Sequence, residues 1–69
     1  MGHRMRVRIA EVTYENGIEE YEVVAEDNIR ARDLVVLYLR DEARRWRRIR
    51  VRDTPNELPG PARVIGRIP

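Results

Sequence analysis

The first part of the chain alternates apolar and polar residues with the period of two that is typical of β-strands. Residues 5–14 and 18–26 carry this alternation, and Asn16-Gly17 lies between them. Asn-Gly is the strongest short hairpin signal, because both positions of such a turn need a positive φ. The pattern therefore predicts an antiparallel hairpin in which Glu15 lies opposite Ile18.

The alternation slips by one residue inside the first of these strands. Its apolar residues occupy odd positions up to Ile9 and even positions from Ala10 onward. A slip of one residue turns side chains to the other face of a sheet. We therefore expect a β-bulge near Ile9-Ala10 that brings both apolar sets onto one face. In this arrangement a row of arginines points outward beside Glu22 and Glu26, namely Arg4, Arg6 and Arg8.

Residues 28–47 have the apolar period of an amphipathic helix. Asp27 or Asn28 can cap its first turn, and the arginines near its end suit the negative pole of the helix dipole. The predicted apolar face consists of Ala31, Val35, Tyr38, Leu39, Ala43 and Trp46. We expect Trp46 to be buried against the sheet. Because residues 34–39 are apolar all round, a buried strand there is the alternative.

The last third of the chain predicts one more strand and a loop. Residues 48–53 alternate again, whereas residues 54–61 hold three prolines and a glycine and predict a loop. Residues 62–68 can form a short edge strand. Residues 1–69 therefore predict a single small α+β domain, ββαβ with an optional fourth strand, in which one helix packs on a mainly antiparallel sheet. We expect residues 1–4 to be disordered or a vector remnant.

Composition excludes several kinds of chemistry. The chain has no Cys, Ser or Lys, and His3 is its one histidine. Disulfides, a zinc cluster, a serine or cysteine nucleophile and a lysine Schiff base are therefore excluded. We expect no enzyme, cofactor, metal site or small-molecule substrate. Since no apolar run reaches the ~18 residues of a membrane span and no signal peptide is visible, we expect a cytoplasmic protein with no membrane partner.

The charges are segregated along the chain. Residues 11–27 carry seven acids and no base, whereas residues 28–52 carry nine arginines against three acids. All 14 basic residues are arginine, whose planar fork matches phosphate oxygens. Such a cluster is the electrostatic footprint of nucleic-acid binding. The predicted nucleic-acid contacts are Arg44, Arg48, Arg50 and Arg52, extended by Arg4, Arg6 and Arg8.

These features favour a small, non-catalytic accessory protein that binds DNA or RNA with low specificity, because phosphate contacts carry no base information. The absence of Cys and Gln is typical of heat-adapted proteins, and we expect a viral or archaeal factor. A GC-rich genome would also favour arginine over lysine. The alternative is a protein-interaction module, such as an adaptor, inhibitor or assembly subunit, that acts through a sheet edge or an exposed apolar helix patch.

The predicted helix has more apolar residues than one face can bury. A core of this size supplies only roughly 3–5 kcal/mol of net stability, and self-association would add to it. We therefore expect a homo-oligomer, with a dimer as the first choice because two-fold dimers are the commonest assemblies. The predicted interface consists of Leu34, Val36 and Leu37.

Overall fold

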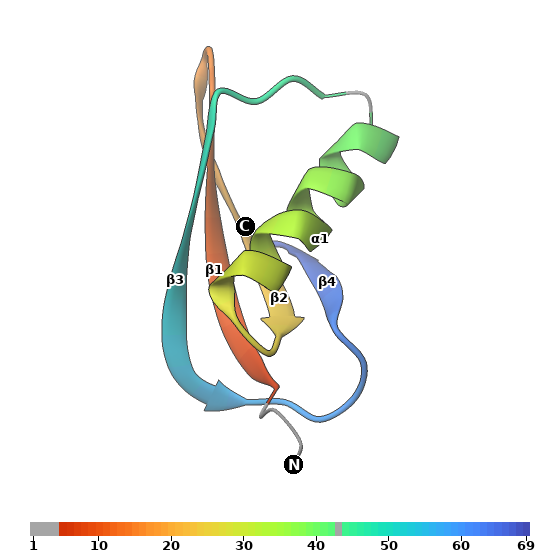
Figure 1. Cartoon of the computed structure of the whole chain (residues 1–69). Coiled ribbons are helices and arrows are strands. Elements are labelled where there is room, and N and C mark those ends of the chain that lie inside the picture. The colour runs from red at the N-terminus through yellow and green to blue at the C-terminus, as the bar shows by residue number, and fades with distance from the viewer. Residues whose placement is uncertain (1–4, 43) are drawn as a thin grey trace.

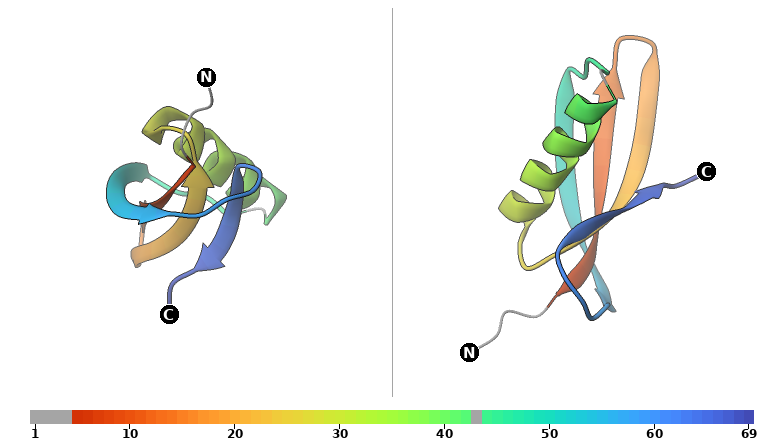
Figure 2. Two further views of the ribbon diagram at one scale, coloured as in Figure 1. Left: turned by 90° about the horizontal axis from the view of Figure 1, so that it is seen from below. Right: turned by 90° about the vertical axis from the view of Figure 1, so that its right-hand side faces the viewer.

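The computed structural model describes residues 5–42 and 44–69. The elements within these residues are β1 (Arg6–Tyr14), β2 (Gly17–Ala25), α1 (Asn28–Asp41), β3 (Arg48–Glu57) and β4 (Arg63–Arg67). The strands form one antiparallel sheet in the order β3-β1-β2-β4, and α1 lies along one face of it (Figures 1 and 2). The predicted α+β fold and its optional fourth strand are confirmed. The expectation for residues 1–4 lies outside the described residues.

The predicted hairpin is present, but its turn begins one residue earlier than expected. Tyr14 lies opposite Gly17, so Glu15 and Asn16 form the two-residue turn. The predicted pairing of Glu15 with Ile18 is therefore wrong. The observed register differs from the predicted one by two residues. Because this shift is even, each strand keeps the inward and outward faces that its alternation indicates.

The bulge predicted at Ile9-Ala10 is also wrong, because β1 and β2 pair without interruption. The apolar residues of β1 consequently lie on both faces of the sheet. Those at even positions face α1, whereas Val7 and Ile9 lie on the other face together with Val24, and all three are buried. The chain after β3 passes the start of β1 on its way to β4, and the Leu58 N–H donates to the Met5 carbonyl at 3.2 Å (Figure 1). Because the start of β1 is covered on both faces, its odd-position and even-position apolar residues are both buried without a bulge.

The irregularity in the sheet lies between β1 and β3 instead. Arg8 lies opposite Asp53 and Arg6 opposite Glu57, so β3 advances four residues where β1 advances two. Pro55 falls inside this irregular stretch. A proline that cannot donate to a ladder is tolerated there, because β3 is an edge strand. The loop predicted from residue 54 therefore begins later, after β3 ends at Glu57.

The helix begins where predicted and ends earlier. The Asp27 side chain caps it by accepting the Arg30 N–H at 2.7 Å. The helix ends at Asp41 rather than at residue 47, and the Arg44 N–H donates to the Leu39 carbonyl at 3.2 Å. This bond is of the type that closes helix C-termini in the Schellman motif. Residues 34–39 are helical, which excludes the alternative of a strand.

The main core lies between α1 and the sheet. Ala31, Val35 and Leu39 of α1 are fully buried in it, and the rings of Tyr21 and Tyr38 meet edge to face with centroids 5.7 Å apart. The buried cluster consists of Ala10, Val12, Tyr14, Tyr21, Val23, Ala25, Ala31, Val35 and Leu39. Ala43 of the predicted apolar face lies outside the described residues. No helix in the described part of the chain is long and apolar enough to cross a membrane.

Candidate nucleic-acid interface

The structure divides the predicted arginine cluster between two faces of the molecule. On β3, the exposed Arg48, Arg50 and Arg52 alternate with the partly buried Ile49 and Val51, so the arginines lie on the sheet face away from α1. Arg44 lies on the α1 side, where it reaches residues of the core. Neither Arg44 nor Arg48 is helical, because both follow the end of α1 at Asp41.

The sheet face away from α1 carries both signs of charge. Arg52 forms an ion pair with Glu20 at 3.0 Å, and Arg50 lies opposite Glu11 in the register of β3 with β1. A hollow on this face is lined by Glu11 together with residues 50–52. An acid in such a place would repel a phosphate, so this face is a poorer match for nucleic acid than the sequence suggests.

Arg44 is held by Glu19 of β2. Its Nη1 donates to Oε1 at 2.7 Å and its Nη2 to Oε2 at 3.3 Å, while its Cζ lies 4.2 Å from the centroid of the Tyr14 ring. The Tyr21 hydroxyl donates to Glu19 at 2.9 Å, and Arg67 of β4 donates at 3.2 Å. The bonds from Arg44 and then Tyr21 lower the pKa of Glu19 from its ordinary 4.5 to about 2. Arg44 therefore serves as a structural link.

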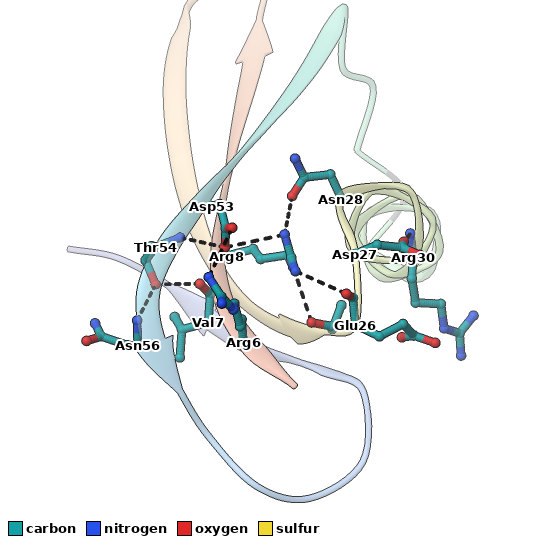
Figure 3. Close-up of polar contacts among 11 residues, drawn as sticks. Arg6, Val7, Arg8, Glu26, Asp27, Asn28, Arg30, Asp53, Thr54 and Asn56 are labelled. Carbon is teal, nitrogen blue, oxygen red and sulfur yellow. Dashed lines mark hydrogen bonds and ion pairs between the residues drawn. The ribbon is translucent and has the colours of Figure 1, made fainter. Parts of the chain in front are cut away.

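Arg8 is buried, with 7% of its surface exposed, so the prediction that it points outward is wrong. Its guanidinium donates to the carbonyls of Ala25 at 3.2 Å and Glu26 at 3.1 Å and to Oδ1 of Asn28 at 2.6 Å (Figure 3). It also lies 3.4 Å from Asp53. An uninterrupted β1 explains why Arg8 is buried, because alternate residues of a strand share a face and Arg8 therefore lies on the same face as the core residues Ala10 and Val12.

The other two arginines of that row are Arg6 and Arg4. Arg6 is partly exposed and pairs with the same Asp53 at 3.4 Å. Arg4 lies outside the described residues. The sequence signal that was missed is the shared even parity of Arg6 and Arg8 with Ala10 and Val12, which an uninterrupted strand places on one side.

A different set of arginines is left without acidic partners. These residues are exposed, and they form no ion pair with any residue that the structure describes. They are Arg30, Arg32, Arg40, Arg45, Arg48 and Arg50. Sequence reasoning selected only Arg48 and Arg50 of this set, because it could not tell which arginines the acids of the hairpin would engage.

Trp46 lies in the segment 44–47, which connects α1 to β3. Three of these arginines lie near it, namely Arg32, Arg40 and Arg45. A hollow of about 560 Å³ is lined by Val36, Arg40, Arg44, Arg45 and Trp46, and we call it the Trp46 hollow. The Cζ of Arg32 lies 5.5 Å from the centroid of the indole ring. Trp46 packs against the core but is only partly buried, because it follows the helix rather than lying on its apolar face. No acid among the described residues lines this hollow.

The predicted oligomer residues differ in how accessible they are. Leu37 is 51% exposed, whereas Leu34 packs against the core. A second hollow on α1 is lined by Val36 and Leu37 together with Arg30, Arg32 and Asp33. It shares Val36 with the Trp46 hollow, so the two are neighbours along the helix.

Comparisons with known proteins give no relative: the chain matches no family model, no curated protein and no solved structure.

Proposed function

We propose that this protein is a small, non-catalytic nucleic-acid-binding protein that contacts phosphates through arginines. The observation that carries the proposal is the Trp46 hollow, which the unpaired Arg40 and Arg45 line together with an aromatic ring and with no acid in the described lining. The hollow on the sheet face away from α1 contains an acid, Glu11, and so does the neighbouring hollow on α1, Asp33. A concave basic site with an aromatic side chain suits a ligand that is both anionic and aromatic.

The unpaired arginines are the better phosphate ligands. A guanidinium that already holds a carboxylate must give up that bond to take a phosphate, whereas an unpaired one gives up only water. Arg40 and Arg45 therefore bind phosphate at lower cost than Arg44, which holds Glu19, or Arg52, which holds Glu20. The proposed contacts thus shift from the cluster that the sequence indicates to Arg32, Arg40 and Arg45.

A titration with duplex DNA, single-stranded DNA and structured RNA at ~50 mM salt tests this proposal, because phosphate contacts are only weakly screened there. We expect micromolar or tighter binding that weakens with salt, with a log–log slope of about −0.9 per neutralised phosphate on duplex DNA and about −0.7 on single strands. Binding to none of the three at micromolar protein would contradict the proposal.

Charge-matched variants locate the contacts. Arg40→Gln and Arg45→Gln each remove one unpaired charge. We expect each to reduce the log–log slope of affinity against salt by about 0.9 on duplex DNA, which is the contribution of one neutralised phosphate. Arg52→Gln is the control, since it removes the same charge from an arginine already paired with Glu20. Equal losses from all three variants would show that net charge, rather than this hollow, governs binding.

A second candidate function is supported by the apolar residues exposed on α1. Ile29 is 75% exposed and Leu37 is 51% exposed, although apolar side chains on a charged helix would be better buried by a partner. This surface favours the protein-interaction module. Failure to bind nucleic acid, together with loss of a protein partner on Leu37→Glu, would favour this function over the first.

A further inference from the structure

The Trp46 hollow combines two kinds of side chain that act on different parts of a nucleotide. The indole ring of Trp46 offers a flat aromatic face, and the guanidinium of Arg32 lies over it with its Cζ 5.5 Å from the ring centroid. Arg40 and Arg45 line the same hollow and have no ion pair with a described residue. An aromatic ring and a guanidinium plane both stack on bases, and free guanidinium groups bind phosphates.

The segment that carries Trp46 is fixed at both ends. At its start, the Arg44 N–H donates to the Leu39 carbonyl at 3.2 Å and the Arg44 side chain holds Glu19. At its end, the Arg47 N–H donates to the Thr13 carbonyl at 2.7 Å. Arg45 and Trp46 lie between these two anchors. A ligand would therefore meet a site whose backbone is already ordered, which lowers the entropy cost of binding.

We infer that the Trp46 hollow takes an unpaired base, so that the preferred ligand is single-stranded nucleic acid. This inference rests on the proposed function and adds the class of strand to it. The base stacks on Trp46 beneath or in place of Arg32, and the flanking phosphates contact Arg40 and Arg45. A duplex keeps its bases stacked within the helix and would have to extrude one at a cost, so it can offer this site only its backbone.

Trp46 is the one tryptophan in the chain, so its fluorescence reports on this hollow alone. The experiment compares a ten-nucleotide single strand with the duplex of the same sequence and with a strand of the same length that lacks bases. We expect the single strand to quench Trp46 and to bind about ten-fold more tightly than the strand without bases, the order that one base stacked on an aromatic side chain provides. The duplex is expected to bind without comparable quenching.

Two substitutions separate stacking from folding. Trp46→Leu keeps an apolar side chain against the core but removes the aromatic face, whereas Trp46→Tyr keeps an aromatic face. With a dye-labelled oligonucleotide, we expect Trp46→Leu to lose about ten-fold in single-strand affinity and Trp46→Tyr to retain most of it. Neither change should alter duplex affinity. Circular dichroism at the assay temperature verifies that both variants are folded.

The outcomes distinguish this inference from the proposed function. Equal affinity for the strands with and without bases, or an unchanged single-strand affinity of folded Trp46→Leu, overturns the stacking site and leaves phosphate binding intact. A free mononucleotide that binds as tightly as the ten-nucleotide strand overturns the assignment to a strand. Binding to no nucleic acid overturns both the inference and the proposed function.

Discussion

At the scale of single residues, Arg8 shows how one charged side chain can hold a small fold together. Its guanidinium donates to two carbonyls at the end of β2 and to the side chain of Asn28 at the start of α1 (Figure 3). It therefore links β1 to the β2–α1 connection. Arg6 lies two residues earlier on the same strand and pairs with the same Asp53, but it is partly exposed. The two arginines thus form a matched pair that differs in burial.

This difference predicts a difference in stability. We expect Arg8→Ala to lower the free energy of unfolding by about 1–3 kcal/mol, because it leaves the buried carbonyl of Ala25 without the Arg8 donor. Arg6→Ala should cost less than about 1 kcal/mol, as is usual for an exposed ion pair. Urea denaturation of the two variants measures both values. Equal losses would show that the shared Asp53, rather than burial of the guanidinium, determines the effect.

At the scale of elements, Glu19 ties the connection from α1 to β3 to the sheet. This carboxylate on β2 binds Arg44 from the connection and Arg67 from β4, and it accepts the Tyr21 hydroxyl. Burial, followed by the bond with Tyr14, raises the pKa of Tyr21 above its usual range, so its hydroxyl remains a donor. Glu19 thereby joins three segments beside the Trp46 hollow.

The low pKa of Glu19 makes this link sensitive to acid. Its pKa is about 2 in the folded protein against an ordinary 4.5. The carboxylate therefore contributes its full stability above about pH 4.5, and this contribution is lost as the pH falls through 2. We expect Glu19→Gln to cost about 1 kcal/mol at pH 7 and progressively less toward pH 2, as measured by denaturant unfolding across that range.

The control for this prediction is Glu15→Gln. Glu15 lies 3.6 Å from Arg47, and both side chains are largely exposed, so we expect almost no loss at any pH. A cost of Glu19→Gln that stays constant from pH 7 to pH 2 would contradict the role assigned to its charge.

The elements also show which features a sequence can predict. Alternation and the Asp27 cap are local signals, and they correctly place the first two strands and the starts of α1 and β3. The end of α1 has no such signal, because arginine is a good helix former and residues 42–48 contain no Gly or Pro. β3 pairs with β1 from Arg47 and Thr13 onward, and this long-range pairing, rather than a local sequence signal, ends the helix. The same long-range pairing removes Trp46 from the helix and creates the hollow.

At the scale of the whole molecule, the fold brings the two oppositely charged segments of the chain together. Acids of the hairpin pair with arginines that follow α1: Glu15 with Arg47, Glu19 with Arg44, and Glu20 with Arg52. Which arginines remain unpaired depends on the strand order and register. Composition and spacing do not contain this information, so the sequence predicts an arginine-rich candidate site but does not indicate which arginines lack an acidic partner.

The exposed apolar residues of α1 lead to a prediction about the assembly. Leu37 is 51% exposed and Ile29 is 75% exposed, eight positions apart and therefore about two turns away on the same helix. Burial of apolar area contributes roughly 25 cal/mol per Å², and a core of this size has little stability to spare. We therefore expect a dimer at tens of micromolar protein, with α1 at the contact, as measured by analytical ultracentrifugation.

Substitutions on two surfaces test where the dimer contact lies. Leu37→Glu places a charge in the proposed interface, so we expect it to shift the sedimenting species to the monomer while leaving the far-ultraviolet circular dichroism unchanged. Ile18→Glu is the matched control, because Ile18 is 61% exposed but lies beside the hairpin turn, on the sheet face away from α1. A monomeric mass for the unaltered protein contradicts the prediction outright. Dissociation by Ile18→Glu but not by Leu37→Glu would move the contact from the helix to the sheet.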